Sequence, residues 1–137
     1  MNILEVVDKK TKKEFHKVPK VLYKDDQNWT CPLDAEIEGI FDSNHNICFQ
    51  HGEAIRWILK DNSGKPIGRI AAFYDKNKAY HGSQPTGGIG FFECIDQQDA
   101  ANLLFDTAKT WLHEKGMKAM DGPINFGENI VYWGLLV

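Results

Sequence analysis

A strand, a long amphipathic helix and a second strand follow one another between residues 89 and 120, and this order constrains the fold most. Residues 89–94 and 117–120 are short apolar runs typical of strands. Between them, Asp96 is the expected helix N-cap and Gly116 the expected C-cap. The apolar stripe of this helix consists of Leu103, Leu104, Ala108, Trp111 and Leu112. Because one helix joins the two strands, we expect a parallel pair with a right-handed crossover.

An antiparallel meander is predicted before this helix. The pattern of residues 53–60 has the period of two that is typical of a strand, and the turn residues 61–64 follow it. A second strand is expected over 67–74, which makes a hairpin with the first. A polar, glycine-rich loop over 75–88 then leads into the strand at 89–94. These three strands form the centre of the predicted sheet.

The N-terminal part adds a short strand over 3–7, a helix over 10–22 that Pro19 weakens, and a short helix over 34–41. The predicted fold class is therefore mixed α/β (α+β), with a mostly antiparallel meander, one parallel crossover and flanking helices. The expected core joins the inward positions of the strands and the long helix. These positions are Ile55, Trp57, Ile70, Phe91, Leu104, Ala108 and Trp111.

Length and charge narrow the classes of function. At 137 residues the chain fits one domain with a core of its own. A net charge of −3 argues against a nucleic-acid partner, although residues 1–24 hold seven Lys and only three acidic residues. We interpret this basic stretch as a solvated helix face, with contact to phosphates or an acidic partner as the alternative. No apolar run reaches the roughly 18 residues that span a bilayer, so no membrane partner is expected.

The two ends of the sequence support two further expectations. The first residues lack the apolar core of a signal peptide, so we expect a cytoplasmic protein whose cysteines are free thiols. The last residues, Ile130 to Val137, are apolar throughout. An exposed run of this kind is an aggregation hazard. We therefore expect residues 1–137 to form a single domain truncated at its C-terminal end, with a continuation of the chain or a second copy covering this run.

Six phrases spread along the chain carry a family resemblance. In order they are Leu22 to Asp26 with Asn28 and Trp29, Pro32 with Leu33, Phe49 to Glu53, Gly68 to Ala72, Gly90 to Glu93, and Gly122 to Phe126. Together with the order of the elements, they resemble the N-terminal part of a large bacterial family of GNAT-related proteins, that is, of acyl-CoA N-acyltransferase-like proteins. The resemblance implies an incomplete GNAT-like fold.

The resemblance also implies where acetyl-CoA would bind. In GNAT enzymes the fourth strand offers backbone groups to the pantetheine arm, which by position makes Phe91, Phe92 and Cys94 the candidate cofactor-binding residues. A turn rich in glycine and basic residues then cradles the pyrophosphate at the helix start. Here that turn has neither a glycine nor a cation, and it carries Asp96 and Asp99. We therefore expect no cofactor in this chain, with acetyl-CoA as the cofactor if the chain is an enzyme.

Glu93 is the candidate catalytic residue. Some GNAT enzymes hold a carboxylate at this position that deprotonates the amine nucleophile, and neighbouring aromatic rings favour the raised pKa that such a base needs. The alternative is a carboxylate at a strand end that is hydrogen-bonded to the next element. His45, Cys48 and His51 are metal-ligand types, but their spacing is not that of a zinc site, and no metal is expected.

The sequence thus favours a GNAT-like domain of an acyltransferase-related protein that acts as a scaffold or recognition half rather than as a complete enzyme. Two alternatives stay open at this point. The first is an active N-acetyltransferase that transfers an acetyl group from acetyl-CoA to an amine. The second is a protein-interaction module that binds another chain through Ile130 to Val137.

Overall fold

A computed structural model describes residues 1–30, 32–80, 84–124 and 126, and it contains one five-stranded sheet. The strands lie in the order of the sequence: β1 (Asn2–Glu5), β2 (Gly52–Lys60), β3 (Pro66–Asp75), β4 (Thr86–Cys94) and β5 (Ala119–Asp121). The pairs from β1 to β4 are antiparallel, whereas β4 and β5 are parallel. The predicted meander and the predicted parallel pair are both confirmed.

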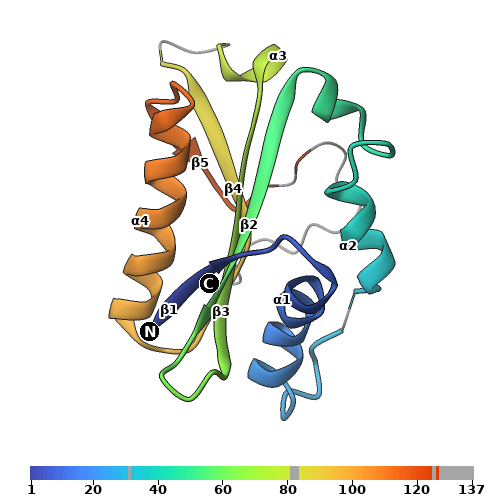
Figure 1. Ribbon diagram of the computed structural model, residues 1–137, viewed down its shortest axis with the longest axis vertical. Helices are drawn as coiled ribbons and strands as arrows, with labels where there is room; N and C mark the ends of the chain where they lie inside the picture. Colours follow the sequence, from blue (N-terminus) through green and yellow to red (C-terminus); the bar gives the residue numbers. More distant parts are fainter. Residues whose placement is uncertain (31, 81–83, 125, 127–137) are drawn as a thin grey trace.

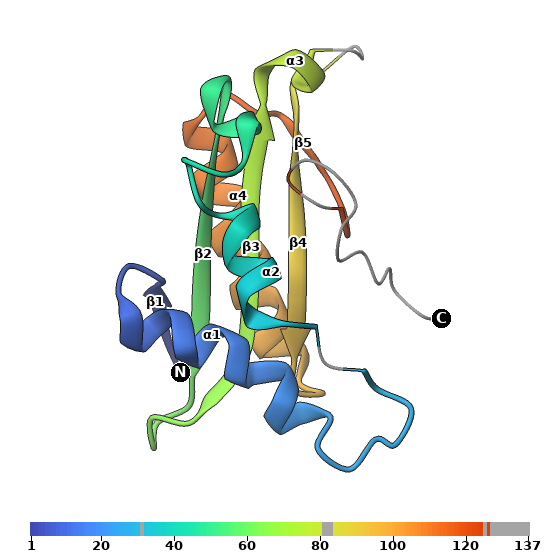
Figure 2. The same ribbon diagram turned by 90° about the vertical axis from the view of Figure 1, so that its right-hand side faces the viewer.

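Helices cover both faces of the sheet (Figure 1). The helices α1 (Lys9–Leu22) and α2 (Asp34–Ile40) lie on one face, and α4 (Gln98–Glu114) lies on the other. Figure 2 shows α1 and α2 in front of the sheet with α4 behind it. The 3-10 helix η1 (Ile47–Gln50) and the one-turn helix α3 (Lys76–Ala79) cover one end of the sheet on the side of α2.

The face of α4 packs against the sheet as its sequence predicts. Leu104, Ala108 and Leu112 are buried in one cluster with Trp57 of β2 and Ile70 of β3. Two glycines in the strands allow α4 to lie close to the sheet, because they carry no Cβ atom. A Cβ atom added at Gly68 would lie 2.8 Å from Leu104, and one added at Gly87 would lie 2.5 Å from Leu112. Trp111 is only partly buried, although its ring meets that of Trp57 edge-on.

The prediction that Phe91 packs beside Leu104 is wrong, because β4 contains a bulge. Ala71 pairs with Gly90 and Arg69 pairs with Glu93, so two residues of β4 stand against one residue of β3. Phe91 adopts a φ of 53°, in the left-handed region. Its side chain packs on the α1 and α2 face of the sheet, whereas the inward residues of α4 pack on the other.

A partly buried ion cluster holds α1 and α2 on the sheet. Glu38 of α2 lies 2.6 Å from Nε2 of His16 in α1, and it accepts two hydrogen bonds from Arg56 of β2 at 2.6 and 3.0 Å. The Arg56 guanidinium lies over the Phe41 ring, 4.2 Å from its centroid. Burial opposes ionisation of Glu38, but the hydrogen bonds from His16 and Arg56 outweigh it and lower the pKa of Glu38 to about 2.

Several boundaries differ from the expected ones. The helix α4 has Gln97 as its N-cap rather than Asp96, and no side chain caps it. Part of the expected loop over 75–88 is instead α3 and the start of β4. The helix α1 continues through Pro19 to Leu22, and Gly116 has the left-handed conformation expected of a C-cap.

The apolar run Ile130 to Val137 lies outside the described residues. In the described part of the chain, no helix is both long and apolar enough to cross a membrane.

The packing of α4 predicts a difference between two adjacent leucines. Leu104 is fully buried, so the substitution Leu104→Ala should lower the free energy of unfolding by about 2–5 kcal/mol. Leu103 is partly exposed, and Leu103→Ala should cost clearly less. Urea denaturation of both variants measures the two losses. Equal losses would mean that the inward face of α4 is assigned incorrectly.

The Glu38 cluster predicts a loss of stability in acid. The folded-state pKa of Glu38 lies below its ordinary value of 4.5, so its carboxylate stabilises the fold above that pH. This contribution should disappear as the pH falls from 4.5 towards 2. Urea denaturation between these pH values should therefore show a steeper loss for the wild type than for Glu38→Gln. Glu36→Gln is the matched control, because Glu36 is exposed on the same helix, and it should follow the wild type.

Candidate functional site

The outer edge of β4 is partly open. The strand β5 pairs with β4 only over Thr86 to Gly88, and the N–H of Ile124 then donates to the carbonyl of Ile89 at 3.0 Å. Beyond that point, no described strand pairs with residues 90–94 of β4 on this side. Figure 2 shows β5 diverging from β4 in this region.

The four predicted site residues do not lie on one face. Phe91 and Glu93 point to the side of α1 and α2, where Phe91 meets the rings of Phe15 and Phe41. Phe92 stacks on Phe105 of α4 with ring centroids 4.4 Å apart. Cys94 packs against the cluster under α4, and burial raises the pKa of its thiol. A single ligand on one face would therefore contact only part of the predicted set.

Tyr23 is a partner of Glu93 that the sequence did not predict. Its hydroxyl donates a hydrogen bond to the Glu93 carboxylate, which links the end of α1 to β4. Burial, together with the hydrogen bond and charge of Glu93, raises the pKa of Tyr23 above its ordinary range. The Tyr23 ring also packs against Trp29, 5.4 Å away. The two residues are 70 positions apart, so local sequence patterns could not pair them.

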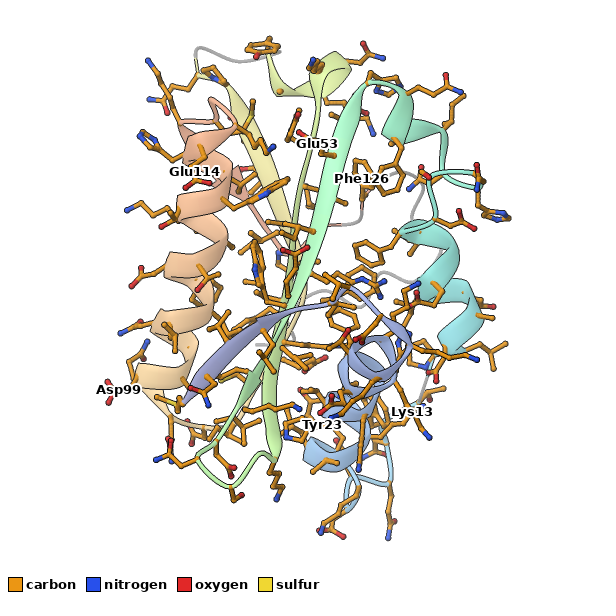
Figure 3. The ribbon with its side chains drawn as sticks, in the orientation of Figure 1. Lys13, Tyr23, Glu53, Asp99, Glu114 and Phe126 are labelled. Carbon is orange, nitrogen blue, oxygen red and sulfur yellow. The ribbon has the colours of Figure 1, made fainter. Side chains whose placement is uncertain are left out.

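The start of α4 is acidic. Asp96 and Asp99 are both exposed there, and Asp99 points away from the sheet at the lower end of the helix in Figure 3. No side chain caps the first turn, so its N–H groups are open. The helix dipole at this end favours an anion, but residues 95–99 supply two carboxylates and no Lys or Arg.

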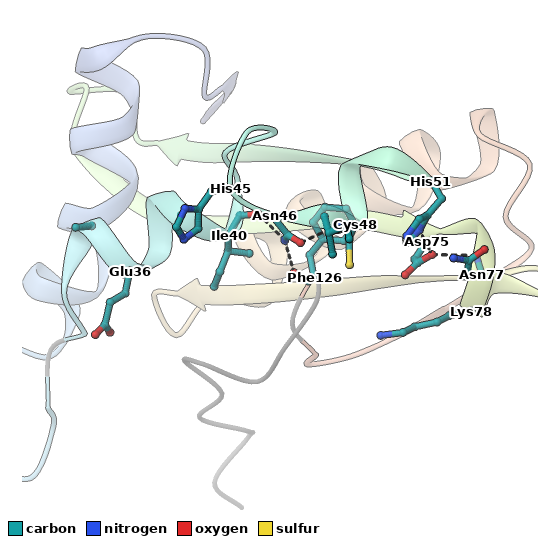
Figure 4. A pocket seen from close by; sticks show the side chains of 13 residues that line it. Glu36, Ile40, His45, Asn46, Cys48, His51, Asp75, Asn77, Lys78 and Phe126 are labelled. Carbon is teal, nitrogen blue, oxygen red and sulfur yellow. Dashed lines mark hydrogen bonds and ion pairs between the residues drawn. The ribbon is translucent and has the colours of Figure 1, made fainter.

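A pocket of about 870 Å³ lies between α2, η1 and the end of β3 (Figure 4). Its apolar lining includes Ile40, Ile47 and Phe126. At one end, Nδ1 of His51 lies 2.6 Å from Oδ1 of Asp75, and the pair is drawn together in Figure 4.

Several polar groups of this pocket lie near Asp75. Cys48 lies beside it, and burial together with the Asp75 carboxylate raises the pKa of the Cys48 thiol. Lys78 also lines this end of the pocket, whereas Glu36 and His45 lie at the other end. The sequence singled out His45, Cys48 and His51, but it did not predict Asp75 as their neighbour. The described residues contain no group of three or more His, Cys, Asp or Glu side chains placed to hold a metal ion.

Two curated bacterial proteins are similar to this chain in sequence. Protein YghO of Escherichia coli is 31% identical over 123 residues, which cover 90% of this chain and 31% of that protein. Bacterial ceramide synthase of Caulobacter vibrioides is 31% identical over 131 residues, which cover 89% of this chain and 33% of that protein. The chain thus spans about a third of the length of the curated relatives it matches. No protein-family model matches it.

Solved structures of acetyltransferases share the fold. A predicted acetyltransferase from Clostridium acetobutylicum, solved with acetyl-CoA, matches 98% of this chain and 95% of its own with a TM-score of 0.64 and 13% identity. The aminoglycoside N-acetyltransferase AAC(6')-Iy, with a bisubstrate analogue, matches 90% of this chain and 79% of its own with a TM-score of 0.58 and 18% identity. At these identities the likeness concerns the fold alone, and the chain has a GNAT-like fold.

Proposed function

We propose that this chain is the recognition part of a longer acyltransferase-related protein and that it does not bind acetyl-CoA by itself. The acidic start of α4 is the observation that carries this proposal. The family resemblance assigns the pyrophosphate to this helix start, where Asp96 and Asp99 are exposed. The acyltransferase relation is supported by the GNAT-like fold and by the similarity to a protein named bacterial ceramide synthase. A ceramide is an N-acylated long-chain amine, so the chemistry concerned is amide formation.

The electrostatic cost at this site explains the expected weak binding. Two carboxylates beside a pyrophosphate repel it, and each contact of this kind costs on the order of 1 kcal/mol near a protein surface. The open N–H groups of the first turn attract an anion, and the helix dipole adds about 0.3–1 kcal/mol. The repulsion from the two carboxylates, about 2 kcal/mol in total, exceeds this attraction. No cation is present in residues 95–99 to favour binding.

The α1 and α2 face supplies the recognition surface in this proposal. It carries the pocket of about 870 Å³, whose apolar lining and few polar groups are typical of a small-molecule site. Glu93 lies on the same face but accepts the hydrogen bond of Tyr23. We therefore propose that Glu93 ties α1 to β4. Its role as a general base stays a prediction.

An active N-acetyltransferase is the second candidate, and the open edge of β4 favours it. Residues 90–94 have no described strand partner on one side, so their backbone groups could bind the pantetheine arm that the resemblance implies. The interaction module depends on Ile130 to Val137, which lie outside the described residues. Association through this run stays a prediction that light scattering tests.

Isothermal titration with acetyl-CoA separates the first two candidates. For the wild-type chain of 137 residues, we expect no saturable heat in the micromolar range. The variant Asp96→Asn/Asp99→Asn should bind more tightly, by roughly tenfold, because it removes both repelling charges. Asp106→Asn/Glu114→Gln is the matched control, since it changes the net charge equally farther along α4. Micromolar binding by the wild type would instead support the enzyme.

The Tyr23 and Glu93 contact can be tested by titrating tyrosine absorbance. Because Glu93 helps to keep Tyr23 protonated, Glu93→Gln should lower the pKa of Tyr23 towards its ordinary value. A matched pair is available in Tyr74, whose pKa burial and Glu53 raise to about 12. Glu53→Gln should affect Tyr74 and leave Tyr23 unchanged. A Tyr23 titration that is the same with and without Glu93 would show that the two side chains do not meet in solution.

A further inference from the structure

The His51 and Asp75 pair at the end of the pocket is held in a fixed geometry. Asp75 ends β3, and its side chain is only 10% exposed. The same Oδ1 atom accepts the hydrogen bond of the Asn77 N–H at 2.9 Å, at the start of α3, and lies 2.6 Å from Nδ1 of His51. The backbone of His51 is anchored as well, because its carbonyl accepts the N–H of Lys76 at 2.8 Å.

This geometry determines which nitrogen of the neutral imidazole is basic. A carboxylate only accepts hydrogen bonds, so Nδ1 carries the proton and Nε2 carries the lone pair. Nε2 has no hydrogen-bond partner among the described residues, and His51 is 29% exposed and lines the pocket. A histidine whose orientation is fixed by a carboxylate and whose second nitrogen is open is the arrangement that general-base catalysis requires.

We propose that His51 is the general base for an acyl acceptor bound in this pocket, with Asp75 as its positioning residue. This inference rests on the proposed function and names its acceptor: a primary amine attached to an apolar body. The apolar body fits the lining formed by Ile40, Ile47 and Phe126. Only the neutral amine has the lone pair that attacks a carbonyl carbon, and Lys78 lines the same end of the pocket as Asp75.

The pocket adjoins the strands on which an acyl donor would lie. A smaller cavity of about 210 Å³ shares Asp75, Lys78 and Phe126 with it and is also lined by Gly88 of β4 and Asp121 of β5. The acceptor therefore approaches β4 from its N-terminal end. The acidic start of α4 follows the other end of that strand. The acyl donor is a thioester, and its nucleotide, where it has one, would be bound by another part of the longer protein.

The chemical step balances with the groups named. The amine nitrogen attacks the carbonyl carbon of the thioester, and a C–N bond forms while the C–S bond breaks. His51 Nε2 accepts a proton from the attacking nitrogen and delivers it to the leaving thiolate. The products are an amide and a thiol. Cys48 is not the nucleophile in this scheme, because burial and Asp75 raise the pKa of its thiol and keep it protonated.

A nucleotide-free probe tests this proposal separately from acetyl-CoA binding. The wild-type chain is incubated with S-acetyl-N-acetylcysteamine, an acyl thioester without a pyrophosphate, and with octylamine, and the amide is quantified by mass spectrometry. We expect His51→Gln to lower the protein-dependent rate by at least about tenfold, as for the loss of a general base. Asp75→Asn should lower it less and alter its pH profile. His113→Gln is the matched control on the exposed end of α4 and should leave the rate unchanged.

Three results of the rate measurement contradict the proposal. A wild-type rate no higher than that of buffer would overturn it, as would an equal rate for folded His51→Gln. An acetyl group found on Cys48, with the rate lost in Cys48→Ala, would assign the step to covalent catalysis instead. Should a variant fail to fold, the side-chain ¹⁵N spectrum of the wild type gives a second test. Octylamine must then perturb the His51 Nε2 signal, and a signal that does not respond contradicts the proposal. Micromolar acetyl-CoA binding would overturn the proposed function but not this assignment.

Discussion

The contact of Glu38 with Arg56 and His16 is the interaction on which the α1 and α2 layer depends. Arg56 and His16 are almost completely buried, and an unpaired charge at such a position costs several kcal/mol. Glu38 neutralises the Arg56 guanidinium through two hydrogen bonds and joins both helices to β2. The same contact fixes one wall of the pocket, because residues of α2 line it. The ion cluster therefore links the stability of the fold directly to the geometry of the candidate site.

The bulge in β4 sets the second constraint. The extra residue places Phe91 on the α1 and α2 face, beside Phe15 and Phe41, and leaves Phe92 on the face of α4. Glu93 then points back towards Tyr23. The edge of β4 that no described strand pairs with begins in the same region, after Ile89.

Features with a regular period could be predicted from the sequence, whereas contacts between distant segments could not. The stripe Leu104, Ala108 and Leu112 predicted the buried face of α4, and the alternation in β2 predicted the hairpin. The sequence pattern predicts the wrong face for Phe91, because strict alternation of a strand contains no bulge. The pairing of His51 with Asp75 depends on where the chain after η1 places His51 beside the end of β3. Both η1 and α3 are too short to leave a periodic signal.

We propose that this GNAT-like fold keeps its acceptor side, whereas the acidic nucleotide side does not bind coenzyme A. Backbone amide spectra recorded during parallel titrations with octylamine and with coenzyme A test it directly. The account predicts that octylamine shifts amides around the pocket, among them His51 and Lys78, and that coenzyme A leaves residues 90–99 unchanged. Saturable shifts at residues 90–99 with coenzyme A, and none at the pocket with octylamine, would contradict it.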